Sequence, residues 1–175
     1  MVINKRLKYG IEENKFKDQL DYRYMTESDL EAVLEIERLS NPFPWTEQNF
    51  IDCLRRDYYC LIQIHSDGVS GFAIQSIALD EAHLLNIGVS SNKRRQGLGS
   101  DLLEKIIYAS ETMGSNKIFL EVRVSNAAAT NLYLDFGFKQ IGVRKDYYRL
   151  PEGKEDALLM SKSLRKGWKD RFFSN

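Results

Sequence analysis

The stretch Arg-Arg-Gln-Gly-Leu-Gly at residues 94–99 decides how this 175-residue chain is interpreted. It lies between a predicted strand at residues 83–89 and a run of apolar residues at helical spacing that begins at Leu98 and stops before Gly114. The first turn of a helix carries free N–H groups and the positive end of the helix dipole, which together bind anions. Glycines also let the backbone approach a bulky phosphate closely. The stretch therefore suggests a phosphate-bearing ligand.

The same two glycines would also suit an ordinary tight turn between a strand and a helix, and the six residues alone leave both interpretations open. Other phosphate-binding loops fit poorly. The Gly-Lys-Ser/Thr sequence of a P-loop is absent, and Leu102 stands where a dinucleotide fingerprint starting at Gly97 needs its third glycine. Lys93 and the two arginines that follow add positive charge for a pyrophosphate. We expect a nucleotide-bearing cofactor other than ATP or NAD.

Several segments together carry a resemblance to a known family. The pattern Arg94-x-x-Gly97-x-Gly99 resembles the loop of the GNAT N-acetyltransferases whose amides hold the pyrophosphate of acetyl-CoA. Further segments occur in the order and spacing of the RimI-type branch, which acetylates the N-terminal alanine of a small-subunit ribosomal protein. They lie at residues 42–45, 79–81, 86–87, 95–99, 120–123, 125–129, 132–133, 137–138 and 147–148. The resemblance covers residues 22–164.

The resemblance implies an α/β (α+β) GNAT fold, with a central mixed and mostly antiparallel sheet of about six to seven strands flanked by about four helices. Hydrophobic periodicity independently gives the order α-α-β-β-β-α-β-α-β-β, with β-α-β crossovers in the second half. A capping box at residues 28–31 and a cap at Thr46 predict the first two helix starts. The later helices are predicted from Gly97 onward and at 126–136. The strands are predicted at 59–64, 69–79, 83–89, 117–124, 138–144 and 156–162.

Length and composition indicate one folded domain. The resemblance implies that it spans residues 22–164, which leaves an N-terminal extension at 1–21 and a basic C-terminal tail at 165–175. Lys+Arg 25 balances Asp+Glu 25, so we expect no direct binding to nucleic acid and no attraction to a membrane. A charged start and the lack of a long apolar run predict a cytoplasmic protein. Two cysteines and two histidines, none at zinc-ligand spacing, predict that no metal is bound.

Glu121 is the candidate catalytic base. In the strand predicted at 117–124, alternation places it on one face with Phe119 and Arg123. If helices cover both faces of the sheet, this carboxylate is partly buried and suited to accept a proton. The residues alone also allow a plain Glu121–Arg123 ion pair on an exposed face. The resemblance implies that Glu121 is the proton acceptor.

Tyr133 is the candidate catalytic acid. It follows Asn126 by seven residues, or two helical turns, so the two side chains share one helix face. The spacing alone also fits a tyrosine that only packs in the core. The resemblance implies that Tyr133 donates a proton to the departing CoA sulfur, and that backbone N–H groups of 87–89 stabilise the oxyanion. It implies these cofactor-binding residues: Ile87, Gly88, Val89, Arg94, Arg95, Gln96, Gly97, Leu98, Gly99, Ser100 and Asn126.

The function that the resemblance implies is acetyl transfer from acetyl-CoA to the N-terminal α-amine of a small-subunit ribosomal protein, with alanine as the first residue. Residues 41–45 and 146–148 are candidate walls of the acceptor cleft, and the sequence leaves open whether Tyr147 or Tyr148 faces the substrate. Ser100 departs from the family pattern, because arginine or lysine is common there. Two alternatives stay open: a GNAT enzyme acting on a small amine or a lysine side chain, and an acyl-CoA-sensing module without catalysis.

Overall fold

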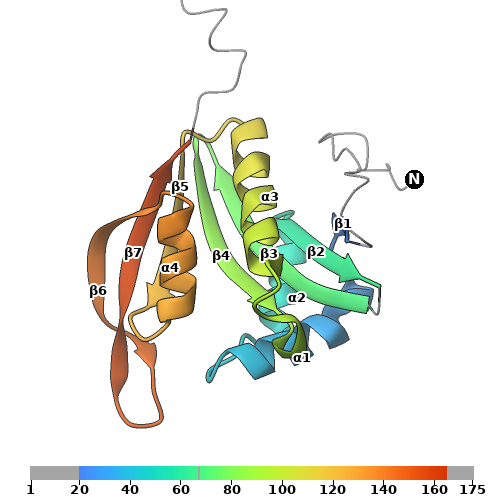
Figure 1. Cartoon of the computed structure of the whole chain (residues 1–175), viewed down its shortest axis with the longest axis horizontal. Helices are drawn as coiled ribbons and strands as arrows, with labels where there is room; N and C mark the ends of the chain where they lie inside the picture. The colour runs from blue at the N-terminus through green and yellow to red at the C-terminus, as the bar shows by residue number, and fades with distance from the viewer. Residues whose placement is uncertain (1–19, 67, 165–175) are drawn as a thin grey trace, which may run out of the picture.

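The computed structural model describes residues 20–66 and 68–164, which fold into one seven-stranded sheet with helices on both faces (Figure 1). Residues 1–19 of the expected extension and the expected tail at 165–175 lie outside the described residues. The strands are β1 (Asp21–Tyr24), β2 (Tyr59–His65), β3 (Gly68–Ala78), β4 (Glu81–Val89), β5 (Lys117–Arg123), β6 (Lys139–Arg149) and β7 (Lys154–Ser163). The helices are α1 (Leu30–Ser40), α2 (Glu47–Arg55), α3 (Leu98–Thr112) and α4 (Ala127–Asp135), and the 3₁₀ turns η2 (Glu27–Asp29) and η3 (Ser91–Lys93) precede α1 and α3.

The strand order is β1-β2-β3-β4-β5-β7-β6, and every neighbouring pair is antiparallel except β4 and β5. Helix α3 provides the crossover between these two parallel strands. The mixed, mostly antiparallel sheet with four helices confirms the predicted fold. Because β7 is inserted between β5 and β6, the second predicted crossover joins strands that are not neighbours in the sheet.

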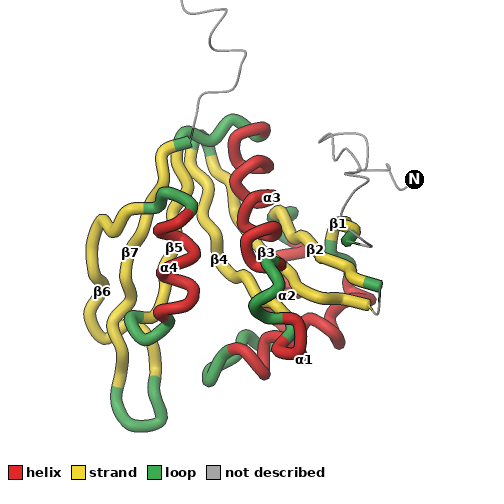
Figure 2. The backbone as a smooth tube through the Cα atoms, in the orientation of Figure 1, coloured by secondary structure: helices red, strands yellow, loops and turns green. Residues whose placement is uncertain are grey.

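Alternating residues of the central strands enter two separate hydrophobic clusters. Leu61 and Ala73 belong to a cluster with α3 and α4, whereas Ile62 and Phe72 belong to a cluster with α1 and α2. Successive side chains of a strand point to opposite faces, so both faces of the sheet must be covered. Figure 2 shows the helices arranged around the sheet in this way.

The strands differ from those predicted in several places. The first strand, β1, was not predicted, because four residues carry no readable period; it is held by its antiparallel ladder to β2. It begins at Asp21, one residue before the predicted start of the domain. Strand β6 continues to Arg149, past a register shift between Arg144 and Tyr148 where Asp146 has φ 51°. Strand β7 begins at Lys154, earlier than predicted.

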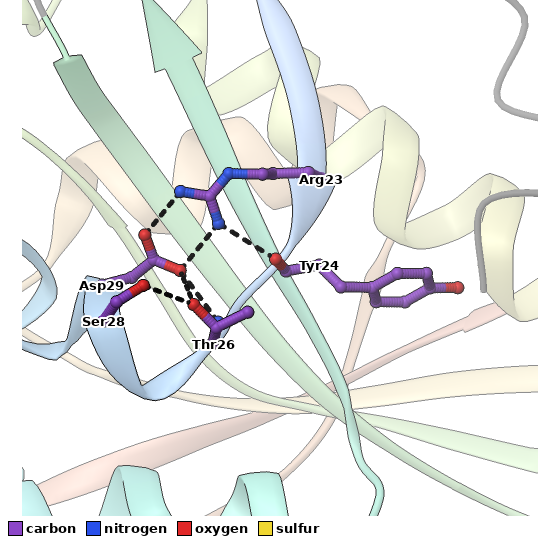
Figure 3. A network of polar contacts seen from close by, with 5 residues as sticks. All are labelled: Arg23, Tyr24, Thr26, Ser28 and Asp29. Atoms are coloured by element: carbon purple, nitrogen blue, oxygen red, sulfur yellow. Dashed lines mark hydrogen bonds and ion pairs between the residues drawn. The ribbon is translucent and has the colours of Figure 1, made fainter. Parts of the chain in front are cut away.

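The capping box lies two residues earlier than predicted. The backbone N–H of Thr26 donates to the Asp29 carboxylate at 2.8 Å, and that carboxylate also accepts two hydrogen bonds from Arg23 at 2.7 and 2.5 Å (Figure 3). Asp29 is buried, and the Arg23 guanidinium lowers its pKa below the usual range. The polar cluster thus fastens strand β1 to the start of α1.

The parallel pair β4–β5 parts halfway along its length. Its pairing runs from Glu81 opposite Lys117 to Leu84 opposite Leu120, and no later pair is formed. On the other side of β4, the ladder with β3 shifts register between Leu84 and Asn86, so Leu85 is an extra residue in β4. A bulge bends the strand that contains it. The two strands therefore splay just before Glu121.

Candidate active site

A pocket of about 170 Å³ lies where β4 and β5 splay. Three parts of the chain form its walls: the end of α1 with the loop that follows it, the two splayed strands, and α4 with β6. The lining residues are Glu37, Ser40, Asn41, Pro42, Trp45, Leu84, Leu85, Asn86, Ile87, Leu120, Glu121, Val122, Arg123, Asn126, Tyr133 and Tyr148. Both candidate catalytic residues thus line the same pocket.

Glu121 is partly buried, with 27% of its side chain exposed. Its Oε1 lies 2.8 Å from the Arg144 guanidinium of β6, and the Tyr147 phenol interacts with the same carboxylate, which raises the pKa of Tyr147. The alternative Glu121–Arg123 ion pair is not formed. Arg123 pairs instead with Glu155 at 3.2 Å and lies over the Tyr148 ring, 4.3 Å from its centroid. Glu121 therefore combines access to the pocket with partners that orient its carboxylate.

Tyr133 is buried on α4, with its ring 5.7 Å from that of Phe138. Burial raises the pKa of its phenol well above the ordinary value, because a phenolate would lose its hydration. No group in the part of the chain that the structure describes forms a recorded hydrogen bond with this hydroxyl. The arrangement keeps the proton on the phenol at neutral pH, as a general acid requires.

Asn126 lines the same pocket. The helix was predicted to begin at this residue, but it begins one residue later, at Ala127. Asn126 is the N-cap of α4, and its side-chain oxygen accepts a hydrogen bond from the backbone N–H of Ala129 at 3.1 Å. Asparagine is a preferred N-cap because this bond satisfies a helix N–H that has no partner within the helix. The cap fixes the turn that leads from the Glu121 strand into the Tyr133 helix.

The structure separates the roles of the two tyrosines on β6. Tyr148 lines the pocket, and burial raises its pKa to about 12. Tyr147 is not a lining residue, and its interaction with the Glu121 carboxylate raises the pKa of its phenol. Of the other expected wall, Asn41, Pro42 and Trp45 line the pocket. Trp45 also packs on the buried Phe50 ring, at a centroid distance of 5.4 Å.

The glycine loop lies beyond the end of β4 and does not line this pocket. Gly97 has φ 84°, and a Cβ added there would meet nothing within 4 Å, so its backbone conformation, and not space, favours glycine. Arg95 also has positive φ, at 65°. Residues 94–97 are exposed, Leu98 is buried, and Gly99 and Ser100 are partly buried in the first turn of α3.

The three basic residues that precede the glycines differ in their exposure and contacts. Lys93 is buried, whereas the two arginines that follow it are exposed. Arg94 donates a hydrogen bond to the Ser40 hydroxyl at the end of α1, at 2.9 Å. Among the strand residues predicted to bind the cofactor, Ile87 lines the pocket, Gly88 is buried under Phe72, and Val89 is partly buried. The loop and the pocket are thus joined by the last residues of β4.

The sequence reasoning missed Glu37. This carboxylate is buried, with 2% exposure, and lines the pocket. It falls four residues after Val33 and seven after Leu30, on the apolar face of α1. A charged residue at a position where the helical period demands an apolar one is the signal that could have identified it.

The described residues, 20–66 and 68–164, hold neither a candidate metal cluster nor a candidate membrane span. No group of three or more histidine, cysteine, aspartate or glutamate side chains that could hold a metal ion occurs among these residues. In the same ranges, none of the helices is both long enough and apolar enough to span a membrane.

Comparison with known proteins identifies the family. The model of the acetyltransferase (GNAT) family matches residues 30–138. The ribosomal protein bS18-alanine N-acetyltransferase of Salmonella typhimurium is 41% identical over 137 residues, covering 78% of this chain and 93% of the relative. The Escherichia coli protein of the same name is 42% identical over 135 residues, covering 77% and 90%.

A solved structure agrees with these sequence matches. The crystal structure of the ribosomal-protein-S18-alanine N-acetyltransferase from Escherichia coli superposes with a TM-score of 0.78 at 37% identity, covering 83% of this chain and 94% of that chain. The family model, the related sequences and the solved structure thus agree on one family. The chain belongs to the GNAT family of acetyltransferases.

Proposed function

We propose that this acetyltransferase moves the acetyl group of acetyl-CoA to the N-terminal α-amine of a small-subunit ribosomal protein, with alanine as the first residue. The observation that carries the proposal is that Glu121 and Tyr133 line one pocket at the splay of β4 and β5. The relatives that are named bS18-alanine N-acetyltransferases support this choice of acceptor.

Acetyl-CoA fits the groups that this part of the chain offers. A Cβ added at Gly99 would make only ordinary contacts of 3.6 Å and more, so packing within the protein does not explain this glycine. Close approach by a phosphate would explain it, and the N–H groups of the first turn of α3 favour an anion there. When bound, acetyl-CoA supplies the activated acetyl group. In this assignment residues 94–100 hold the pyrophosphate, and residues 87–89 with Asn126 hold the part that leads to the acetyl group.

Glu121 accepts the proton of the acceptor amine. An N-terminal amine has a pKa near ~8, so much of it is protonated at neutral pH and cannot attack a thioester. The carboxylate has access to the pocket, and Arg144 and Tyr147 fix its orientation. General acid–base steps of this kind contribute about 10²–10⁴-fold to the rate.

Tyr133 gives its proton to the departing sulfur. The phenol carries a proton over the whole neutral range, and its place in the same pocket as Glu121 supports this role. Within Ile87–Val89, the backbone N–H groups that point away from β3 are the donors proposed to stabilise the oxyanion, since β4 has no ladder partner on the β5 side beyond Leu84. The loop at 41–45 and Tyr148 form the proposed acceptor walls.

The test is acetyl transfer by the full chain to a peptide that copies the N-terminus of ribosomal protein bS18 from the same organism. We expect mass spectrometry to find acetate on the α-amine of that peptide. A peptide with a blocked N-terminus and an internal lysine should stay unmodified. Acetylation of the lysine peptide alone would establish the alternative acceptor, and tight acetyl-CoA binding without transfer to any amine would establish a sensing module.

The role of Glu121 is tested with a matched pair of variants. We expect Glu121→Gln to lower kcat by about 10²-fold or more while acetyl-CoA binding is retained. Glu81→Gln makes the same chemical change at the exposed start of β4 and should behave as the wild type. Equal rates for the two variants would remove Glu121 from the mechanism.

A further inference from the structure

Glu37 is a buried carboxylate for which the proposed chemistry has no use. Its Oε1 accepts hydrogen bonds from the backbone N–H of Trp45 at 3.0 Å and from the side-chain amide of Asn41 at 3.2 Å. Its Oε2 accepts a hydrogen bond from the side-chain amide of Asn86 at 3.2 Å. A charge taken out of water is tolerated only when such partners replace its hydration.

The three donors come from two different walls of the pocket. Asn41 and Trp45 belong to the loop between α1 and α2, whereas Asn86 belongs to β4 just after its extra residue, Leu85. All three residues line the pocket together with Glu37. A single carboxylate therefore joins the loop to the strand at the point where β4 turns away from β5.

An apolar side chain would suit this position better for stability alone. Glu37 lies on the helix face that also buries Val33 and Leu34, and a buried ionic group is often no more stabilising than a well-packed apolar one. What an apolar residue cannot do is accept hydrogen bonds from both walls at once. The geometry of these bonds fixes how far the loop stands from the strand.

We propose that Glu37 is a positioning residue that sets the width of the acceptor end of the pocket by holding residues 41–45 against Asn86 of β4. This inference rests on the proposed function, in which that loop forms an acceptor wall. Glu37 touches neither the reacting amine nor the acetyl group in this assignment. Its loss misplaces the acceptor, and a displacement of about 1 Å can cost on the order of 10²-fold in rate.

The hydrogen-bond directions allow a reciprocal exchange. Glu37→Gln keeps the size of the side chain but places an N–H₂ group against a donor, on either the Asn86 side or the loop side. Asn86→Asp places two carboxylates face to face. The double variant, with Glu37→Gln and Asn86→Asp together, restores a donor opposite an acceptor, because the new amide can donate to the new carboxylate. A residue that only fills space would show no such rescue.

The kinetic experiment measures kcat and KM for the bS18 peptide, and separately the affinity for acetyl-CoA by direct titration. We expect Glu37→Gln to raise the KM for the peptide by about tenfold or more and to leave acetyl-CoA affinity unchanged. The double variant should recover most of the loss. Glu35→Gln, on the exposed face of the same helix, is the matched control and should match the wild type.

A second readout follows the loop itself without requiring activity. The sequence holds two tryptophans, so Trp168→Phe leaves Trp45 as the single reporter. In that background Glu37→Gln should increase acrylamide quenching of Trp45 fluorescence, and the double variant should reverse the increase. If the wild type acetylates no amine, the proposed function fails and this readout alone decides the inference.

The inference is overturned if Glu37→Gln and Glu35→Gln give the same peptide KM and the same Trp45 quenching. It is also overturned if the double variant behaves no better than the worse single variant. Thermal unfolding of each protein shows whether it is folded at the assay temperature, and an unfolded Glu37→Gln protein is replaced in the comparison by Asn86→Asp and the double variant.

Discussion

The guanidinium of Arg144 lies 2.8 Å from the carboxylate of Glu121, so the proposed base is paired with a cation before any amine arrives. Arg144 also lies over the ring of Tyr147, 4.7 Å from its centroid. The arginine side chain is half exposed and comes from β6, next to the register shift that begins there. An acceptor amine must therefore compete with Arg144 for the carboxylate.

Arg144→Gln should lower the KM for the peptide acceptor. Exposed ion pairs contribute less than about 1 kcal/mol, so we expect a decrease of no more than about fivefold. Steady-state kinetics at low and high salt checks the result, because salt screens the wild-type pair and should narrow the difference. Arg149→Gln, an exposed arginine at the end of β6, is the control. A higher KM in Arg144→Gln would contradict the prediction, because it would show that the loss of orientation at Glu121 outweighs the loss of competition with the amine.

Tyr133→Phe should lower kcat by about 10²-fold without abolishing transfer, because a thiol is a fair leaving group even without an acid. The folded state should be little affected, since the hydroxyl has no recorded partner among the described residues and the ring contact with Phe138 remains. Single-turnover acetyl transfer and thermal unfolding measure the two effects. A kcat equal to that of the wild type, in a protein of equal stability, would exclude the phenol as the acid.

The Arg23–Asp29 pair should make stability depend on pH in the acidic range. The pKa of Asp29 is lowered in the folded state, mainly by its hydrogen bonds from Arg23, so its contribution is present above the unfolded pKa of about 4. That contribution is lost as the pH falls through the lower folded pKa. Arg23→Gln should destabilise the protein by about 1–2 kcal/mol at pH 7, and by less in strong acid.

Urea unfolding at pH 7 and at pH 3 measures this difference, with Arg38→Gln on the exposed face of α1 as the control. A difference between Arg23→Gln and the wild type that stayed constant from pH 7 to pH 3 would contradict the assignment to Asp29.

Gly88→Ala should destabilise the protein by about 1–3 kcal/mol, because the added Cβ would lie 2.7 Å from the buried Phe72 ring and 3.2 Å from Ile36. Gly99→Ala is the matched comparison. Its Cβ would make only ordinary contacts, so stability should be unchanged, whereas acetyl-CoA affinity should fall if the loop holds the pyrophosphate. Thermal unfolding and calorimetric titration separate the two outcomes. Equal losses of stability in both variants would contradict the conclusion that packing requires glycine at residue 88 but not at residue 99.

The local pattern of the sequence determined most elements and the candidate residues. Apolar residues at helical spacing identified α3, and Gly114, with φ 90°, ends it where predicted. Alternation along β5 predicted one face with Ile118, Leu120 and Val122, which are buried in the structure, and placed Glu121 on the other face. These features depend on neighbours within one element, so a single segment carries enough information to predict them.

Only the tertiary structure decided which side chains meet. The partner of Glu121 is Arg144 of β6 and not Arg123 beside it, because the sheet places β6 next to β7, which itself pairs with β5. The strand β1, the splay after Leu84 and the buried Glu37 network likewise depend on pairing between segments far apart in the chain. Such contacts arise when the whole sheet assembles, since their energies come from burial and hydrogen bonds that no isolated segment can form.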